Sequence, residues 1–529
     1  MASSSTEDQE KPPLSTTEDV QNDVEKNRGA ASSDAPYSIL SERKKVCLMI
    51  TASFAGLISP LSSTVYFPAL TSLTDAMHVS STRINLTVMM YLIFQGIAPS
   101  FIGSFSDTHG RRPAYLISFV IYLGANIGLA LQTNYAALMV LRCLQACGSS
   151  GTIALGSAVV ADVSTRAERG KYIGYASMGL TLGPALGPVI GGLIDHFCGW
   201  RWIFWFLTIL SGVFLTAIAL FLPETCRAVV GNGSIPAARW NRPVFSVLAP
   251  TTTTSPSKTT TSTTPTTPKP QRLNPLRSAR LVLDQENALI LTYGALLYAG
   301  MAAVLTTLPS TLATHYDFNT IQIGLCYLPM GLGSLTSRYT VGMLLDRTFR
   351  RHAHAQQLRI VPNTQQDISA FDIERARLAV AIPLAYAAAL VFVAYGWVMQ
   401  ARVALAGPVL TLFAGGHLLT GAFSALSTLV VDLNRGSPAT AVAANNLVRC
   451  LLGAGATAGA APVIGRIGVG WMAVVMAVVW VVASPCLWGV YLWGFGWRRA
   501  REGMGEGERE GNNLSTPLPA APSRVEEIR

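Results

Sequence analysis

Hydrophobic residues along this chain form long blocks that are separated by short polar stretches. Twelve of these blocks reach the length of about 20 residues that an α-helix needs to cross the hydrocarbon core of a bilayer. We therefore predict an all-α integral membrane protein with twelve transmembrane helices. Their approximate bounds are 46–69, 84–106, 113–132, 136–161, 171–194, 202–222, 286–311, 320–345, 377–399, 403–431, 439–465 and 471–495.

A long polar segment divides the predicted helices into two sets of six. It contains TTTTSPSKTTTSTTPTTP at 251–268, a composition that cannot build a hydrophobic core. We expect this segment to be a flexible spacer between two helix bundles. The predicted order is a disordered tail over 1–44, an N-terminal bundle over 45–223, a Thr/Pro-rich linker over 224–284, a C-terminal bundle over 285–495 and a disordered tail over 496–529.

Lys and Arg residues predict the orientation, because loops on the cytoplasmic side of a membrane carry an excess of them. With both termini inside, the outer loops hold four Lys or Arg residues, and the short inner loops and flanks hold 12. The four outer residues are Arg83, Arg201, Arg402 and Arg466. We therefore expect both termini and the linker in the cytoplasm. The plasma membrane is the expected location, and the vacuolar membrane is the alternative.

Composition agrees with a membrane protein and argues against several other classes. Hydrophobic residues make up 50% of the chain and charged residues 13%, with a mean hydropathy of +0.38, which is too apolar for a soluble chain of this length. The net charge of +10 is spread along inner helix ends and indicates no nucleic-acid partner. The eight Cys residues include no CxxC pair, so no metal site or cofactor is predicted. The chain also lacks the P-loop or nucleophile motif of an enzyme.

The two sets of six helices carry matching segments. The loop after the second helix reads GSFSDTHGRR at 103–112, and the loop after the eighth reads GMLLDRTFRR at 342–351. The fourth and tenth helices end in VVADV and VVDL, and the fifth and eleventh contain PVIGGL and PVIGRI. Three matches at corresponding helices indicate that the halves arose by duplication.

These segments together resemble the major facilitator superfamily. The features that carry the resemblance are the G-x-x-x-D-x-x-G-R-R loop, LRCLQACG around Arg142, the Gly and Pro series of the fifth helix, and PET at the end of the sixth. Within the superfamily the pattern is similar to the twelve-span drug:proton antiporters. SPLSSTVYFPAL at 59–70, GWRWIFWFL at 199–207 and NNLVRCLLGAGATA at 445–458 resemble the fungal quinidine-resistance-type multidrug exporters. The resemblance implies the major facilitator fold, two pseudo-symmetric six-helix bundles that transport by alternating access.

Charged residues at the inner helix ends predict an ionic cluster. Such a cluster holds the inner mouth of a transporter shut and separates when the two halves rock, and the resemblance implies the same role. The alternative is a basic loop that only sets the topology. We also expect Gly103 to let the second helix approach a neighbour closely. The predicted inner-gate residues are Asp107, Arg111, Arg112 and Asp162 in the first half, and Asp346, Arg350 and Asp432 in the second.

The fifth helix contains the unusual stretch GLTLGPALGPVIGG at 179–192. In water Gly costs a helix about 1 kcal/mol and Pro about 3 kcal/mol relative to Ala, but unpaired backbone groups cost more inside lipid, so the helix persists. Four Gly residues at a spacing of four form a stripe that lets another helix come close. We expect static packing or a flexible seam between the two halves, and in the resembling family this motif marks exporters. The motif consists of Gly179, Gly183, Pro184, Gly187, Pro188, Gly191 and Gly192.

Polar side chains inside membrane helices are costly and usually face a cavity. Arg142 lies roughly 10 Å below the outer surface at the rise of a helix, whereas Arg338 is near an inner helix end and is expected to reach the surface. Tyr66, Phe67 and Tyr91 are candidates for aromatic cavity walls. The candidate cavity, substrate or coupling residues are Arg142, Gln145, Gln95, Tyr66, His417, Asn445, Asn446 and Arg449.

Acidic residues are absent from the middle of every predicted span. Many proton-coupled exporters of cationic drugs use such a residue both as proton carrier and as counter-ion. Proton coupling here would have to use acids at helix edges, His417 or the substrate itself. Neutral amphiphiles, or anions attracted by Arg142 and Arg449, are therefore favoured as substrates.

Three functions remain open. The first is a secondary active transporter that exports small amphiphilic compounds, such as drugs, toxins or secondary metabolites, in exchange for protons. The second is a proton-coupled importer of a small nutrient or metabolite on the same fold. The third is a membrane sensor that does not transport. We expect a monomer in the lipid bilayer with a small-molecule substrate, protons as the coupling ion and no enzyme activity.

Overall fold

The computed structural model describes residues 40–164, 178–231, 241–242, 281–356, 371–434 and 438–514. Within these ranges the regular structure is α-helical. The linker around its Thr-rich stretch, residues 171–177 of the predicted fifth helix, most of the predicted N-terminal tail and residues 515–529 of the predicted C-terminal tail lie outside the described residues.

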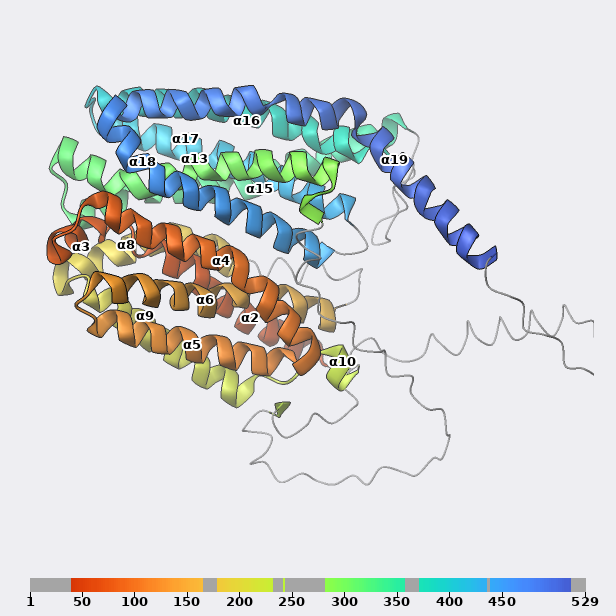
Figure 1. Ribbon diagram of the computed structural model, residues 1–529, viewed down its shortest axis with the longest axis horizontal. Helices are drawn as coiled ribbons and strands as arrows, with labels where there is room; N and C mark the ends of the chain where they lie inside the picture. Colours follow the sequence, from red (N-terminus) through yellow and green to blue (C-terminus); the bar gives the residue numbers. More distant parts are fainter. Residues whose placement is uncertain are drawn as a thin grey trace, which may run out of the picture.

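The described part of the N-terminal half contains six long helices and two short ones, and their arrangement is drawn in Figure 1. The second short helix, α10, follows the sixth long one. In chain order these helices are α2 (Glu42–Thr64), α3 (Leu70–Met77), α4 (Ser81–His109), α5 (Arg111–Leu131), α6 (Tyr135–Val163), α8 (Met178–Cys198), α9 (Arg201–Phe221) and α10 (Arg227–Val230).

The described part of the C-terminal half contains seven helices in a similar arrangement. Its helices are α13 (Gln285–Tyr316), α14 (Thr320–Cys326), α15 (Leu328–Ala355), α16 (Ile373–Gln400), α17 (Ala406–Leu433), α18 (Pro438–Ala483) and α19 (Pro485–Leu514). The last helix extends past residue 495, where the sequence placed the end of the bundle.

The described helices account for the twelve predicted membrane crossings. Nine described helical runs are long and apolar enough to cross a bilayer, and one of them, Thr440–Ala500, is long enough for two crossings. Gly468 breaks that run because its φ is 82°, so the eleventh crossing ends there and the twelfth begins. The helix α8 and the more polar α15 complete the set.

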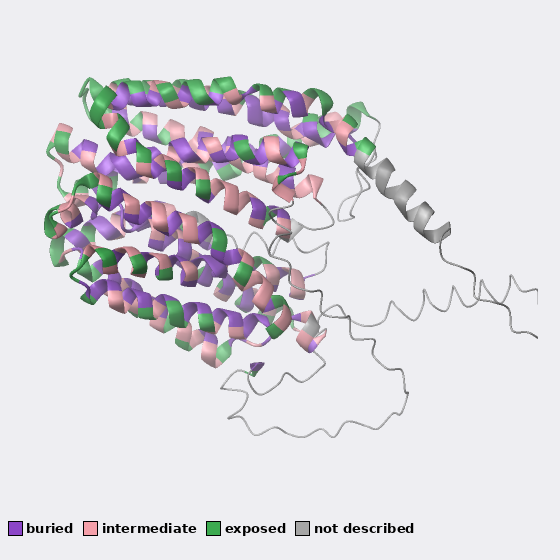
Figure 2. Ribbon diagram, in the orientation of Figure 1, coloured by how far each residue is buried: buried purple, intermediate pink, exposed green. Residues whose placement is uncertain are grey.

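Large apolar side chains on the outer surface of the bundle agree with a membrane location. Phe101, Leu390 and Val482 are each more than 60% exposed, and exposed residues lie on outward surfaces of helices whose inward surfaces are buried (Figure 2). A soluble protein rarely exposes apolar side chains over so many helices. The arrangement is that of an all-α integral membrane protein.

The helix ends lie on two opposite faces of the bundle (Figure 1). We call the face with α10 and the start of α13 the linker side. The other face, with α3 and α14, is called the far side.

Corresponding helices pack in the same way in the two halves. The first helix of each half packs on the fifth, α2 on α8 and α13 on α18, and the second packs on the fourth, α4 on α6 and α15 on α17. This equivalence agrees with the internal duplication. The halves meet where α4 packs on α18 and where α8 packs on α14 and α15.

The four glycines at a spacing of four in α8 face α2 of the same half. A Cβ atom on Gly179, Gly187 or Gly191 would lie 2.0 to 2.2 Å from an atom of Ser53, Thr64 or Val65. Gly183 is similarly close to Pro60 and Leu61. The prediction that this stripe forms the seam between halves is therefore wrong, because its partner is the first helix of its own bundle.

The neighbouring surface of α8 does contact the other half. A Cβ atom on Gly192 would lie 2.4 Å from the carbonyl oxygen of Thr320, and one on Gly331 would lie 2.8 Å from Ala185. One on Gly324 would lie 2.6 Å from the carbonyl oxygen of Pro188. The fifth helix thus lies between two close partners, and α8 continues through both of its prolines.

The expected close approach at Gly103 is absent among the described residues, because no described atom lies within 4 Å of a Cβ built there.

We predict that Gly191→Ala destabilises the protein. The new methyl group would meet the backbone carbonyl of Val65 at the end of α2, and α2 and α8 could make room for it only by losing their close packing. Overpacking of this kind costs about 1–3 kcal/mol. The measurement is the thermal unfolding midpoint of the detergent-solubilised full-length chain. Gly124→Ala is the control, since its Cβ atom meets no described neighbour. Equal midpoints for the two variants would contradict the prediction.

Candidate functional site

Arg142 of α6 is completely buried in the N-terminal half, with an exposed fraction of 0%. Its guanidinium carbon lies 4.0 Å from the centre of the Tyr66 ring and 4.4 Å from the centre of the Tyr91 ring. Cation–π contacts of this kind contribute up to about 2 kcal/mol each when water is excluded. The predicted cavity residues Arg142 and Tyr66 are thus in direct contact.

A network of neutral groups fixes the two tyrosines. The Tyr66 hydroxyl lies 3.0 Å from the Thr87 hydroxyl, and the Tyr91 hydroxyl lies 3.0 Å from that of Ser149. The Tyr91 hydroxyl also donates to the carbonyl oxygen of Ser59 at 3.3 Å. Because both rings are held by their hydroxyl groups, they keep their faces on the guanidinium.

Neutral groups also supply the described hydrogen bonds of Arg142. Its Nη1 donates to Oε1 of Gln145, and Nε2 of Gln145 donates to Oδ1 of Asn126 at 2.7 Å. Its Nε and Nη2 atoms are buried without an acceptor in the described residues. The described surroundings therefore give the charge of Arg142 no acidic partner.

Arg449 of α18 occupies a related environment in the C-terminal half. Its guanidinium carbon lies 4.8 Å from the Tyr298 ring and 5.6 Å from the Phe423 ring. Nη2 donates to Oδ1 of Asn446 at 2.7 Å, while Nε is buried with no described acceptor. This second arginine is again surrounded by aromatic rings and an amide.

The two arginine environments are connected across the contact between the halves. Gln95 lies one turn after Tyr91 on α4, and its backbone oxygen accepts a hydrogen bond from Nδ2 of Asn446 at 3.0 Å. Its side chain donates to the Ser59 hydroxyl at 3.2 Å. One turn of α4 therefore links the ring that covers Arg142 to the amide that holds Arg449.

Two other candidate residues lie on separate contacts. His417 of α17 faces α15, with Nδ1 at 3.0 Å from the Thr336 hydroxyl and Nε2 at 3.4 Å from that of Thr340. Asn445 donates to the Ser427 hydroxyl at 3.2 Å. The structure thus brings Arg142, Gln145, Gln95, Tyr66, Asn446 and Arg449 into one connected region, which we call the central arginine cluster, and leaves His417 and Asn445 outside it.

The linker side of the N-terminal half contains the predicted ionic cluster. Arg111 donates from Nε to Oδ2 of Asp162 at 2.8 Å and from Nη1 to Oδ1 of Asp107. These ion pairs join α4, α5 and α6 of the same half. No described ion pair of this cluster reaches the other half, so the cluster braces three helices and does not itself bridge the mouth between the halves.

Glu224 is a central member of this cluster that the sequence did not single out. Its carboxylate accepts hydrogen bonds from the backbone N–H groups of Arg111 at 2.7 Å and Arg112 at 3.2 Å. A carboxylate at a helix N-terminus is stabilised by these free N–H groups. Gly110 makes the approach possible, because its φ is 110° and a Cβ atom there would lie 2.3 Å from Oε2 of Glu224.

Arg112 turns away from the acids of the predicted gate. Its Nη2 donates to the backbone oxygen of Ala219 near the end of α9, at 2.8 Å. The end of α9, through Ala219, and the PET segment, through Glu224, are therefore both bonded to the start of α5.

The C-terminal half uses different residues from those predicted. Asp432 pairs with Nε of Arg377 on α16 at 3.0 Å, and Asp346 and Arg350 form no ion pair within the described chain. In the N-terminal half Gly110 ends α4, whereas the corresponding Phe349 lets α15 continue to Ala355. The predicted pairing of Asp346 and Arg350 with Asp432 is therefore wrong, because the matching arginines stay on α15.

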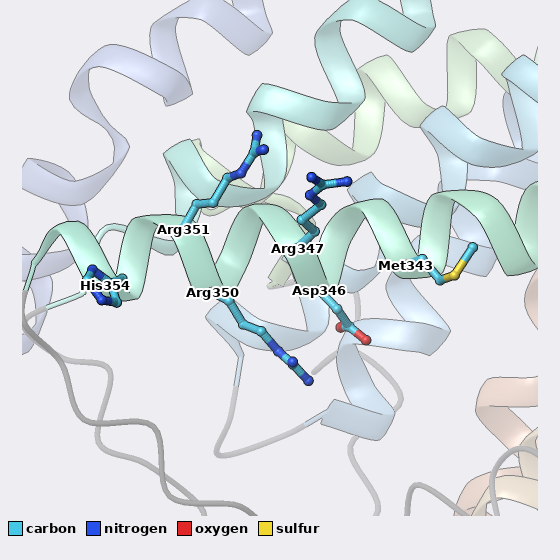
Figure 3. A pocket seen from close by; sticks show the side chains of 6 residues that line it. All are labelled: Met343, Asp346, Arg347, Arg350, Arg351 and His354. Atoms are coloured by element: carbon cyan, nitrogen blue, oxygen red, sulfur yellow. The ribbon is translucent and has the colours of Figure 1, made fainter.

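Figure 3 shows where Asp346 and Arg350 lie on α15. Asp346 and Arg350 point to one side of α15, and Arg347 and Arg351 point to the other, around a shallow, open pocket that Met343 and His354 also line.

A buried ion pair joins two helices at the linker side of the C-terminal half. Nε of Arg498 on α19 donates to Oε1 of Glu374 at 2.7 Å, and Nη2 donates to the backbone oxygen of Phe371 at 2.6 Å. Both halves thus attach the end of their sixth helix to the start of their third. Residues 496–498 belong to the bundle and not to the predicted tail.

No group of His, Cys, Asp and Glu residues suited to a metal ion is found among the described residues.

We predict that Glu224→Ala lowers the thermal unfolding midpoint by several degrees. It removes the acceptor of buried N–H groups at the start of α5, and each unsatisfied group costs about 1–3 kcal/mol. Asp346→Ala is the control, because this exposed residue has no described ion pair. The detergent-solubilised full-length chain is the sample. A larger loss for Asp346→Ala than for Glu224→Ala would contradict the assignment.

A double-mutant cycle distinguishes the observed pair in the C-terminal half from the predicted one. We expect Asp432→Asn and Arg377→Gln to be non-additive in thermal stability, with a coupling of about 1 kcal/mol. Asp346→Asn and Arg350→Gln should be additive. Coupling in the second cycle and none in the first would restore the pairing expected from the sequence repeat.

Comparisons with known proteins agree with this architecture. The model of the Major Facilitator Superfamily matches residues 52–458. The chain is 44% identical over 497 residues to MFS-type transporter clz19 of Cochliobolus lunatus, covering 94% of this chain and 93% of that protein. It is 33% identical over 495 residues to citrate exporter 1 of Aspergillus niger, covering 91% and 92%.

A solved structure shares the fold. The human organic anion transporter MFSD10 superimposes with a TM-score of 0.54 at 18% identity, covering 85% of this chain and all of that one (100%). With six membrane crossings in the described part of each half, matched packing between the halves and a family model that spans most of the chain, this protein is a transporter, not an enzyme, and belongs to the Major Facilitator Superfamily.

Proposed function

We propose that this transporter exports small amphiphilic organic acids in their anionic form, in exchange for protons. The observation that carries the proposal is the buried Arg142 guanidinium, whose described partners are all neutral. The substrate range is thus narrower than the drugs, toxins and secondary metabolites that the sequence pattern suggests, because it favours acidic members of those classes.

The electrostatic argument rests on the cost of burying a charge. An ion moved from water into a protein interior loses several kcal/mol of solvation even after the surroundings relax. Two cation–π contacts and one hydrogen bond to an amide offset only part of that cost for Arg142. A carboxylate that enters this half of the molecule would meet an unneutralised positive charge.

Arg449 supplies a second charge of the same sign on the other half. Its Nε, like the Nε and Nη2 of Arg142, is a buried donor with no described acceptor. None of the described contacts of Arg142 and Arg449 is an acidic residue, so the central arginine cluster contains no competing carboxylate. This arrangement suits an anion better than a cationic drug, since a cation would meet charge of its own sign.

The aromatic groups of the same region suit an amphiphilic substrate. Tyr66, Tyr91, Tyr298 and Phe423 surround the two guanidinium groups. Flat apolar rings next to a cation provide contacts for both the hydrocarbon and the carboxylate part of an organic acid.

Similarity to citrate exporter 1 supports both an anionic substrate and the outward direction. That relative matches this chain over nearly its full length. Citrate is named for that protein, and for this chain we propose only the shared chemistry of a small carboxylate.

Exchange for protons is energetically favourable for an anion. When one monovalent anion leaves and one proton enters, two positive charges move inward, and a membrane potential of 100 mV contributes about 2.3 kcal/mol for each charge. We place both termini in the cytoplasm and the chain, as a monomer, in the plasma membrane, so that the far side faces outward. Alternating access then requires the contacts of α8 with α14 and α15 to open at the far side.

The test uses the full-length protein in liposomes with radiolabelled citrate as the probe. We expect proton-gradient-driven citrate transport that a protonophore abolishes. Arg142→Gln and Arg449→Gln should each lower the rate at least about tenfold, because loss of a charge-assisted hydrogen bond costs about 1.5–3 kcal/mol. Arg83→Gln, at a far-side helix start, is the control and should transport normally.

Two results would overturn this proposal. One is unchanged citrate transport in the folded Arg142→Gln variant. The other is transport of the cation tetraphenylphosphonium in place of citrate. Net uptake by cells that express the chain, instead of efflux, would favour the importer.

A further inference from the structure

Asp195 lies in the last turn of α8, near the far side, and it is 7% exposed. The Ser72 hydroxyl of α3 donates to its Oδ2 atom at 2.6 Å. The second carboxylate oxygen, Oδ1, is buried without a hydrogen-bond partner in the described structure. This side chain is therefore a buried acid with half of its hydrogen-bonding capacity unused.

The neighbouring elements bring no cation into contact with Asp195. Arg201 of α9 lies over the Trp200 ring and donates to the Gln132 carbonyl oxygen. None of the surrounding ionisable groups forms an ion pair with Asp195 among the described residues. These groups are His196 on its own helix, Asp75 and His78 at the end of α3, Arg201 at the start of α9, and His315 and Asp317 at the end of α13.

This isolation distinguishes Asp195 from three other buried acids, Asp372, Glu374 and Glu224. Asp372 pairs with Arg375 and Glu374 with Arg498, and Glu224 accepts several backbone N–H groups. For Asp195 the structure describes a single neutral hydroxyl.

Three effects disfavour the ionised form of Asp195 in this position. Burial removes water from the carboxylate. No described ion pair forms with the carboxylate, so the Ser72 hydrogen bond and the nearby His196 compensate for that loss only in part. The C-terminal end of α8 carries the negative end of the helix dipole, which repels an anion. Burial in this position therefore shifts the equilibrium of the side chain towards its protonated form.

The position of Asp195 connects this preference to the contact between the halves. One turn earlier on α8, Gly191 packs against Val65 of its own half and Gly192 against Thr320 of the other. The chain between α2 and α3 also reaches across, since the rings of Phe67 and Tyr327 stack at 6.2 Å. The Ser72–Asp195 hydrogen bond ties together the two N-terminal elements that close the far side.

We propose that Asp195 is a proton-dependent latch: the far-side contact between the halves closes when this carboxyl binds a proton and opens when it loses one to solvent. This inference rests on the alternating-access transport proposed above. In an exporter that exchanges substrate for protons, it makes proton uptake from the far side a condition for returning to the closed state. It also supplies an acid for coupling in a chain whose membrane interior has none at mid-depth.

Hydrogen–deuterium exchange of the full-length protein in liposomes tests the latch without a substrate. The readout is deuterium uptake in the last two turns of α8 and in α14, at about pH 5 and about pH 8, corrected for the pH dependence of intrinsic exchange. We expect the wild type to take up at least about twice as much deuterium in these segments at the higher pH. Asp195→Asn should show the low uptake at both.

Two further variants control for folding and for neighbouring charge. Asp75→Asn removes an exposed acid from α3 and should keep the wild-type response. Ser72→Ala removes the hydrogen bond but keeps the carboxyl, so it should still respond to pH.

Either of two results would overturn the latch: no pH response in the wild type, or a full response in Asp195→Asn. Because this readout needs no transported compound, a failure of citrate transport would leave the outcome for Asp195 unaffected.

Discussion

A buried positive charge without an acid beside it is the constraint on which the functional interpretation depends. Arg142 occupies the interior of the N-terminal half, between two tyrosine rings that are themselves held by hydroxyl groups. Such a charge is expensive unless the surrounding structure compensates for it or a ligand does. The described neighbours compensate only in part, and this leaves an electrostatic role for a bound anion.

The two halves share the same helix packing but use different charged contacts at corresponding places. In the first half, a glutamate after the sixth helix caps the start of the third, through Glu224 and the N–H groups of Arg111 and Arg112. In the second half the corresponding helices, the sixth (α19) and the third (α16), are joined by the ion pair of Arg498 and Glu374. Helix packing depends on small and apolar surfaces that duplication preserves, whereas a charged contact can be exchanged for another at the same place. The equivalence of the halves is therefore clearer in their helices than in their charges.

Sequence alone predicted the features that depend on local composition. Helix positions followed from the length of apolar segments, and contact among Asp107, Arg111 and Asp162 followed from the motif and its repeat.

The partner on the other side of a contact was not predictable in the same way. The glycine stripe of α8 was recognisable by its spacing, but spacing does not say whether α2 or the opposite half fills it. Arg350 aligns with Arg111 in the sequence repeat. Phe349 stands at the position of Gly110, so α15 continues where α4 ends, and Arg350 stays on α15 and does not pair with Asp432. Glu224 and Asp195 both read as ordinary acids at helix ends, and only the fold shows that one caps a helix and the other is buried without a cation.

The most direct test of the central claim is nuclear magnetic resonance of the Arg142 side chain in the full-length protein labelled with ¹⁵N-arginine. The Nε–H signal, assigned by its loss in Arg142→Lys, should shift when citrate is added, because a carboxylate then accepts a hydrogen bond from a donor that has no described acceptor in the free protein. Sodium chloride at the same ionic strength should leave it in place. A chemical shift of the Nε–H signal that stays unchanged at citrate concentrations that saturate transport would contradict the account.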